Sequence, residues 1–121
     1  MIHHAADLVI GAAIVLVIFA ALSGVRAAEC GKASYYCCEH QGRTMANGRP
    51  FNQNAMTTAH MTAAFGTKLR VTYRGKSVVV RVNDRGAFAK YGRILDLSRG
   101  AFVVLAGSTG PGVIKICMER L

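Results

Sequence analysis

The stretch SVVVRVNDRG, residues 77–86, decides the fold, because it reads as an apolar strand that stops at a tight turn. Before it, residues 68–73 (KLRVTY) alternate apolar and polar side chains, and the turn at residues 74–76 completes a predicted β-hairpin. One face of the hairpin is apolar and consists of Leu69, Val71, Tyr73, Val78, Val80 and Val82. Val79 interrupts the polar face, which predicts that the second strand is covered on both sides.

Further short strands are expected on both sides of this hairpin. Residues 46–50 (ANGRP) have turn chemistry, because Asn-Gly tolerates positive φ and proline breaks strand pairing. The remaining strands are predicted at residues 31–37 (GKASYYC), 93–97 (RILDL) and 112–119 (GVIKICME). Many short strands without a βαβ rhythm predict a small all-β barrel.

One short helix is predicted after the strand at residues 93–97. Ser98 is placed to cap its N-terminus, the helix runs through about Ala106, and Gly107 lies just past its end.

The first 27 residues differ from the rest of the chain. Leu8–Leu22 is an uncharged apolar run, too short for a membrane span, which needs about 20 residues. Val25-Arg26-Ala27 fits a small-x-small cleavage site, so we expect residues 1–27 to be a secretory signal peptide and residues 28–121 to form one domain. The alternative is an uncleaved N-terminal anchor, because residues 1–7 carry no lysine or arginine. No lipobox precedes Cys30, and the expected location is periplasmic or secreted.

The net charge narrows the class of partner. The chain carries a formal charge of +9, and residues 1–27 contain one arginine and one aspartate, so the rest keeps that charge. A small exported domain this basic prefers polyanions. Its basic residues are scattered and no aromatic RNA-binding motif accompanies them, so we expect no nucleic-acid partner. Export makes a cell-wall polymer the expected partner.

Four cysteines suit an oxidising compartment: Cys30, Cys37, Cys38 and Cys117. Cys37 and Cys38 are neighbours that face opposite sides of a strand, so they are not expected to pair with each other. We expect Cys117 to bond with one of them and Cys30 with the other. The alternative is a zinc site at Cys37, Cys38, His40 and Cys117, whose spacing matches no standard zinc finger.

Carboxylates are scarce after residue 27: Glu29, Glu39, Asp84, Asp96 and Glu119. Asp84 lies in the turn that closes an apolar strand, and Asp96 interrupts the apolar run at residues 94–97. A carboxylate inside an apolar strand must be paired, hydrogen-bonded or shifted in pKa. Arg85 and Arg93 flank the two acids, so one interpretation is a structural ion-pair network and the other is an acid–base site.

His60 ends a run of small residues, 55–60 (AMTTAH), that neither a helical nor a strand period explains. A lone histidine is either a satisfied structural donor or a catalytic group. No nucleophile elbow, phosphate-binding loop, dinucleotide fingerprint or Cys-x-x-Cys motif is present.

Several motifs, in order along the chain, resemble those of one protein family. Its A-S-W-Y-G, G-R-x-T-A-N-G-E-x-F-D and A-L-T-A-A-H stretches match residues 33–37 (ASYYC), 42–52 (GRTMANGRPFN) and 55–60. Its V-x-V-N-D-R-G-P-F and G-R-I-I-D-L-S stretches match residues 80–88 (VRVNDRGAF) and 92–98 (GRILDLS). Over nearly all of residues 31–121 the chain resembles the rare lipoprotein A family of exported lytic transglycosylases.

The resemblance implies a single six-stranded double-psi β-barrel with one short helix. It implies endolytic cleavage of peptidoglycan glycan strands, mainly peptide-poor ones, that forms 1,6-anhydro-muramyl ends. One carboxyl group of raised pKa can serve such a reaction, first as acid and then as base. We expect no cofactor, no metal, no stable membrane insertion after cleavage, and a monomer.

The expected site combines the residues that match the family's motifs. We expect Asp84, Asp96 and His60 around one groove as catalytic residues. The substrate-binding residues are expected to be Tyr36, Asn47, Asn83 and Arg85.

Two positions depart from the family pattern. The glutamate after Ala-Asn-Gly and the aspartate after Phe51 are replaced by Arg49 and Asn52. A cation therefore stands where the family has an acid, which favours the alternative of a non-catalytic, expansin-like barrel that binds cell-wall glycan.

Overall fold

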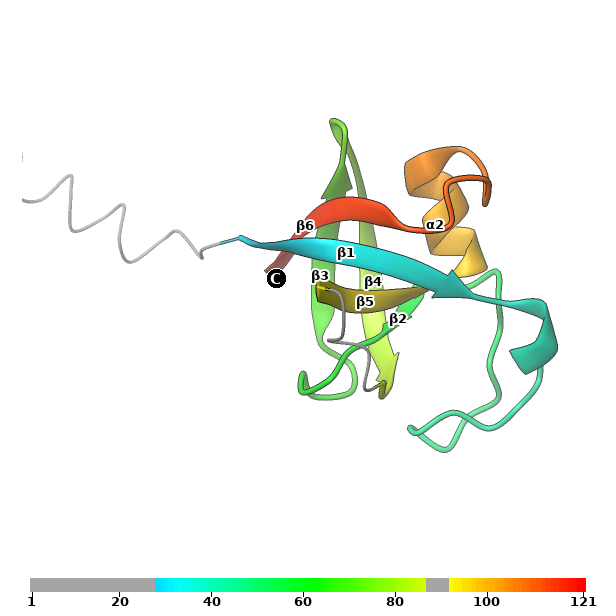
Figure 1. Ribbon diagram of the computed structural model, residues 1–121. Coiled ribbons are helices and arrows are strands. Elements are labelled where there is room, and N and C mark those ends of the chain that lie inside the picture. The colour runs from blue at the N-terminus through cyan, green and yellow to red at the C-terminus, as the bar shows by residue number, and fades with distance from the viewer. Residues whose placement is uncertain (1–27, 87–91) are drawn as a thin grey trace, which may run out of the picture.

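The computed structural model describes residues 28–86 and 92–121, so the predicted signal peptide and residues 87 and 88 of the motif at 80–88 lie outside the described residues. The described chain forms a closed barrel in the order β1-β5-β2-β4-β3-β6 (Figure 1). Its strands are β1 (Glu29–Tyr36), β2 (Thr57–Ala59), β3 (Lys68–Tyr73), β4 (Lys76–Asp84), β5 (Arg93–Ser98) and β6 (Ile114–Arg120). The β1/β5 and β2/β4 pairs are parallel, and the other pairs are antiparallel. The predicted double-psi β-barrel is confirmed.

The strands predicted from alternation are all present, and the hairpin turns at Arg74 and Gly75, both with positive φ. The sequence did not predict β2, nor the short 3₁₀ turn η1 (Cys38–His40). The prediction for Val79 is wrong, because its side chain is 43% exposed on the outer wall. Val80 and Val82 point into the filled interior of the barrel, whereas Val79 points away from that interior and remains in contact with solvent.

The core fills the barrel with side chains from alternate positions of the strands. It contains Ala33, Leu69, Val71, Val80, Val82, Leu95, Leu97, Ile114, Ile116 and Met118. The intervening residues point outward, so the polar positions of β1, β4 and β5 line the outer wall of the barrel. Asp84 and Asp96, two of the three candidate catalytic residues, lie on this outer wall.

The helix α2 (Arg99–Ala106) has the predicted bounds. The Ser98 side chain accepts a hydrogen bond from the Ala101 amide at 3.2 Å, and Gly107 ends the helix with φ 84°. The helix buries Ala101, Phe102 and Leu105 in the barrel core. It packs mainly against β4 and β5, and Figure 1 shows it at one end of the barrel.

Helix α2 also holds the long segment that returns from β1 to β2. Ser98 donates its hydroxyl to the Ala55 carbonyl, and the Gly100 amide donates to the Gln53 carbonyl at 2.8 Å. A Cβ at Gly100 would lie 2.8 Å from the Asn54 carbonyl oxygen, so this close approach requires glycine.

The disulfide prediction is wrong. Cys30 bonds to Cys117, and Cys37 and Cys38 are free. The reason is register: Cys30 on β1 and Cys117 on β6 are directly opposite in an antiparallel pair, with Cα atoms 4.0 Å apart. Because Cys117 is part of this disulfide, it cannot bind zinc as a thiolate, and the alternative zinc site loses one of its four proposed ligands.

Within residues 28–86 and 92–121, no helix has the length and apolar character that a membrane crossing requires.

We predict that the Cys30–Cys117 bond is a main source of stability, because it joins residues 87 positions apart. In the chain-entropy model a bond closing a loop of this size contributes about 4 to 5 kcal/mol. Replacing both cysteines by serine should lower the free energy of unfolding in urea by about that amount. The matched control replaces Cys37 and Cys38 by serine and should change stability little; equal losses in the two variants would contradict the assignment.

Candidate active site

The short strand β2 brings the two candidate acids together. Ala59 pairs with Asp84 of β4 on one side and with Asp96 of β5 on the other. Two strand spacings separate the aspartates, which corresponds to about 9 to 10 Å between their Cα atoms. All three residues line one groove, in which the small Ala59 side chain leaves room between the carboxyl groups.

A β-bulge at the end of β4 aims Asp84 into this groove. Thr58 pairs with Val82, but Ala59 pairs with Asp84, so Asn83 is the extra residue. Strict alternation from the buried Val82 would turn residue 84 toward the core. The bulge shifts that alternation by one residue, so the carboxyl group points outward beside Asp96.

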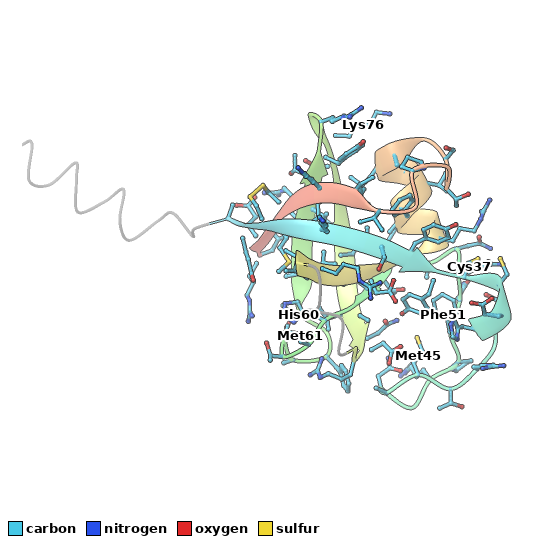
Figure 2. The ribbon with its side chains drawn as sticks, viewed as in Figure 1. Cys37, Met45, Phe51, His60, Met61 and Lys76 are labelled. Carbon is cyan, nitrogen blue, oxygen red and sulfur yellow. A yellow bond between two sulfur atoms is a disulfide. The ribbon has the colours of Figure 1, made fainter. Side chains whose placement is uncertain are left out.

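The groove lies between the outer wall of the barrel and the segment that follows β1. It has a volume of about 280 Å³ and is lined by Tyr36, His40, Arg43, Thr44, Met45, Phe51, Ala59, Asp84, Arg85, Gly86 and Asp96. In Figure 2, Met45 and Phe51 lie beside the barrel on this segment, below Cys37 at the end of β1. We call this cavity the acid groove.

The segment is a hairpin-like loop at residues 42–51, held by its own backbone. The Gly42 amide donates to the Phe51 carbonyl at 2.9 Å, and the Phe51 amide donates to the Arg43 carbonyl at 2.8 Å. At the tip, the Gly48 amide donates to the Met45 carbonyl at 2.9 Å. Gly48 has φ 84°, as the Asn-Gly turn predicted. We call residues 42–51 the 42–51 loop.

Asp84 anchors the 42–51 loop to the barrel. Its Oδ1 accepts hydrogen bonds from the Ala46 amide at 3.0 Å and from the Arg85 amide at 2.9 Å. Charge-assisted hydrogen bonds of this kind are stronger than neutral ones. Asp84 therefore holds the 42–51 loop against the barrel beside the acid groove.

Asp96 is the acid whose pKa is shifted by its surroundings. Burial raises its pKa, and the nearby Asp84 adds to this, while a hydrogen bond from Ser34 and the charges of Arg93 and His40 act in the opposite direction. Ser34 donates its hydroxyl to Asp96 Oδ1 at 3.0 Å across the parallel β1/β5 pair. Asp96 thus keeps a proton to higher pH than an ordinary aspartic acid, as a general acid requires.

Tyr36 forms the wall between the acids and the loop. Its ring stacks on Phe51 with centroids 4.6 Å apart, and His40 meets it edge-on at 5.7 Å. Burial raises the pKa of the Tyr36 hydroxyl, and the charges of Asp84 and Asp96 raise it further. Its buried oxygen has no hydrogen-bond partner within the described chain. A protonated donor near both carboxylates is thus left without a partner.

The ion-pair interpretation of the two acids is wrong. Among the described residues the recorded ion pairs use Glu39 and Glu119, and neither involves Asp84 or Asp96. Arg93 instead donates to the Ser34 hydroxyl at 3.3 Å. Neither aspartate therefore has an ion-pair partner among residues 28–86 and 92–121.

Arg85 lines the acid groove but turns its guanidinium toward the neighbouring loop. That group lies 4.3 Å from the Phe65 ring centroid and donates to the His60 carbonyl at 3.3 Å.

His60 is close to Asp84 in backbone but not in side chain. Its amide donates to the Asp84 carbonyl at 3.2 Å, yet its ring is not part of the acid groove lining. Its Nδ1 accepts from the amides of Thr62 and Ala63 at 3.0 and 2.9 Å. Figure 2 shows His60 beside Met61, on the other side of the view from Met45 and Phe51. Its ring organises the turn after β2.

The other predicted binding residues lie in a second cavity. Asn47 and Asn83 line a cleft on the far side of the 42–51 loop, together with Arg49 and Asn52. The two positions that depart from the family pattern therefore do not line the acid groove.

Sequence reasoning missed Arg43 and Phe51 of the groove lining, and it missed Ser34, which donates to Asp96. Ser34 shares an outward face with Tyr36 by strand alternation, which was a usable signal. Its contact with Asp96 depends on the parallel β1/β5 pair, for which no local signal exists.

The geometry agrees with comparisons to known proteins. A family model described as "Lytic transglycolase" matches residues 28–118. The chain belongs to this family. The "Probable endolytic peptidoglycan transglycosylase RlpA" of Synechocystis sp. is 51% identical over 103 residues, 84% of this chain and 32% of that protein. The protein of the same name from Nostoc sp. is 48% identical, over 82% of this chain and 27% of its own length. The chain thus matches about a third or less of these relatives.

Solved structures share the barrel. The Streptomyces papain inhibitor superposes with a TM-score of 0.66 at 24% identity, over 81% of this chain and 97% of that chain. The apo expansin of Clavibacter michiganensis superposes at 0.64 with 31% identity, over 78% of this chain and 50% of that chain. A mutant of that expansin was solved in complex with cellohexaose.

We predict that Asp96→Asn stabilises the protein at neutral pH. Because burial raises the pKa of Asp96, the stability associated with its protonated form is complete below the unfolded value of about 3.9 and is lost as pH rises through the folded value. Asparagine keeps the shape without ionising. Urea unfolding should show the variant more stable than wild type at pH 7, with the gap closing toward pH 3.5. Glu119→Gln is the control and should show no such gain; a less stable Asp96→Asn at pH 7 would contradict the environment described.

We predict that His60→Ala costs about 1 to 3 kcal/mol of stability, because it leaves the buried Ala63 amide and the part-buried Thr62 amide without their acceptor. Burial, then the charges of Arg120 and Arg85, lower the pKa of His60, while Glu29 acts against them. The contribution of neutral His60 should be complete above its unfolded pKa of about 6.5 and lost as pH falls through the lower folded value. Urea unfolding between pH 4.5 and 8 measures this. A difference between wild type and variant that grows as pH falls would contradict it.

Proposed function

We propose that this protein is an endolytic peptidoglycan transglycosylase that cleaves glycan strands and leaves 1,6-anhydro-muramyl ends. The observation that carries this proposal is the acid groove, in which Asp84 and Asp96 flank Ala59 and Asp96 has a raised pKa. Membership in the lytic transglycolase family and the names of the relatives support it.

The reaction needs one carboxyl group that acts twice. Protonated Asp96 donates its proton to the glycosidic oxygen as the bond from that oxygen to C1 of the muramyl residue breaks. The resulting carboxylate then takes the proton of the C6 hydroxyl as its oxygen bonds to C1 and closes the anhydro ring. The acid is regenerated and no water is consumed. Burial and the Ser34 hydroxyl together set the proton affinity of Asp96 for both steps.

The other groove residues hold the sugar and the developing charge. Asp84 carries a negative charge near C1 as positive charge develops there, and it keeps the 42–51 loop in place through Ala46. Tyr36 offers a protonated hydroxyl to the sugar. His60 acts indirectly, through its backbone contact with Asp84.

The proposed location is outside the cytoplasm, where peptidoglycan lies. The Cys30–Cys117 disulfide is of the kind that persists in an oxidising compartment. We propose that residues 1–27 act as the export signal and that the exported domain works as a monomer.

The second candidate function is an expansin-like barrel that binds glycan without cleaving it. It is favoured by the likeness to the Clavibacter expansin at 31% identity. The acid groove argues for cleavage, because a binder has no need of a buried carboxyl group with a raised pKa beside a second one.

We predict release of 1,6-anhydro-muramyl ends when the protein, expressed from the whole coding sequence, is incubated with peptide-stripped glycan strands. Asp96→Asn should reduce release at least about 100-fold, because it deletes the proton carrier and keeps the shape. Asp84→Asn should also reduce release strongly, whereas His60→Ala should lose less per folded molecule. Chromatography of the products measures this, with Glu119→Gln as a surface control.

Two outcomes would contradict the proposal. Salt-sensitive binding to strands without any anhydro product would assign the protein to the expansin-like class. Release that persists in Asp96→Asn at the wild-type rate would remove Asp96 from the reaction.

A further inference from the structure

A second cleft lies against the other side of the 42–51 loop. It has a volume of about 530 Å³, within the range of about 300 to 1,000 Å³ that is usual for small-ligand sites. Met45 lines both this cleft and the acid groove. Asn83 and Asp84 are adjacent in the chain, and the bulge sends the first to the cleft and the second to the groove. The two cavities are therefore neighbours that one polymer can span.

The cleft is positively charged. Its lining contains Arg49 from the 42–51 loop and Arg81 from β4, and no aspartate or glutamate. Both arginines belong to exposed positions, and neither takes part in an ion pair with a described residue. Two guanidinium groups without a counterion within the described chain favour an anionic ligand.

Three asparagines share the lining of the cleft with the two arginines. Asn47, Asn52 and Asn83 all line the cleft. Asn83 is only 9% exposed, and its Oδ1 has no hydrogen-bond partner within the described residues. Buried polar atoms are usually satisfied, so an orphan one beside a cleft indicates a ligand that donates a hydrogen bond. Sugar hydroxyl and acetamido groups are such donors.

Phe65 supplies the apolar wall. Its ring is 44% exposed in the cleft lining and carries the Arg85 guanidinium at 4.3 Å. Arg85 also lines the acid groove, so the Phe65–Arg85 pair forms a continuous surface between the two cavities. A sugar ring in the cleft can lie on this surface while its neighbour enters the groove.

We propose that this cleft, which we call the arginine cleft, binds the free lactyl carboxylate of a muramyl residue next to the bond held in the acid groove. Arg49 and Arg81 bind the carboxylate, and Asn52 and Asn83 bind the hydroxyl or acetamido groups of the same sugar. The inference rests on the proposed function for the identity of the polymer. It gives Arg49 the role of selecting peptide-free strands, because a stem peptide converts the carboxylate to a neutral amide.

The test measures binding separately from cleavage. Fluorescently labelled, peptide-stripped glycan strands are titrated with the protein carrying Asp96→Asn, so that the strands stay intact. The same strands with their lactyl carboxylates converted to methylamides form the second arm. We expect the amidated strands to bind about 10- to 100-fold more weakly, as expected for the loss of a charged hydrogen-bonded group.

The variants assign this preference to the cleft. In the same background, Arg49→Gln and Arg81→Gln should each weaken binding of the acidic strands about 10- to 100-fold and abolish the preference over amidated strands. Arg49→Lys should restore part of it. Lys76→Gln is the matched control, because it removes the same charge at the opposite end of the barrel from Met45 (Figure 2) and should keep the preference. Thermal unfolding verifies that each variant is folded.

The outcomes separate this inference from the proposed function. Equal binding of acidic and amidated strands by Asp96→Asn, or equal losses in Arg49→Gln and Lys76→Gln, would overturn the arginine cleft. Anhydro ends released equally well from acidic and amidated strands would also overturn it, while leaving the transglycosylase proposal intact. Carboxylate-selective binding without anhydro product from the wild-type protein would retain the cleft and remove the enzyme.

Discussion

The pairing of Ala59 on both of its edges is the constraint on which the rest of the structure depends. Asp84 of β4 lies on one side of it and Asp96 of β5 on the other. Because β2 is the strand between β4 and β5, it closes the barrel at this point. The same backbone hydrogen bonds that close the barrel therefore set the spacing of the two acids. Stability and the geometry of the site are coupled here through three residues.

Asp84 combines structural and chemical roles. The bulge at Asn83 turns its carboxyl group outward, and one of its oxygens then holds both the Ala46 amide and the Arg85 amide. The 42–51 loop is thereby tied to the barrel by a residue of the site itself. A carboxylate fixed by backbone donors costs little reorganisation during a reaction, which is the condition for electrostatic stabilisation of a transition state.

The 42–51 loop separates two surfaces of opposite character. On one side lie Asp84 and Asp96, and on the other lie Arg49 and Arg81. The replacement of a family acid by Arg49 therefore does not place a cation in the acid groove. It changes the neighbouring cleft, which is why the departure from the family pattern is compatible with an intact pair of acids and bears on the choice of polymer instead.

Sequence by itself determined the parts of this protein that depend on neighbouring residues. Alternation identified β3, β4, β5 and most of β1 and β6, and Ser98 and Gly107 gave the bounds of α2, because strand period and helix caps are local properties. The apolar surroundings of Asp96 marked it as a perturbed acid for the same reason. The family motifs supplied the barrel topology.

Only the tertiary structure decided which distant residues meet. The three small residues of β2 have no period, and they are a strand because β4 and β5 both bond to them. Cys30 finds Cys117 rather than Cys37 or Cys38 because the β1/β6 register sets them opposite each other. The turn after His60 directs its ring to the amides of Thr62 and Ala63, away from the acids. In each case the partner is chosen by how a closed barrel aligns its strands, and that alignment is a property of the whole chain that no local pattern contains.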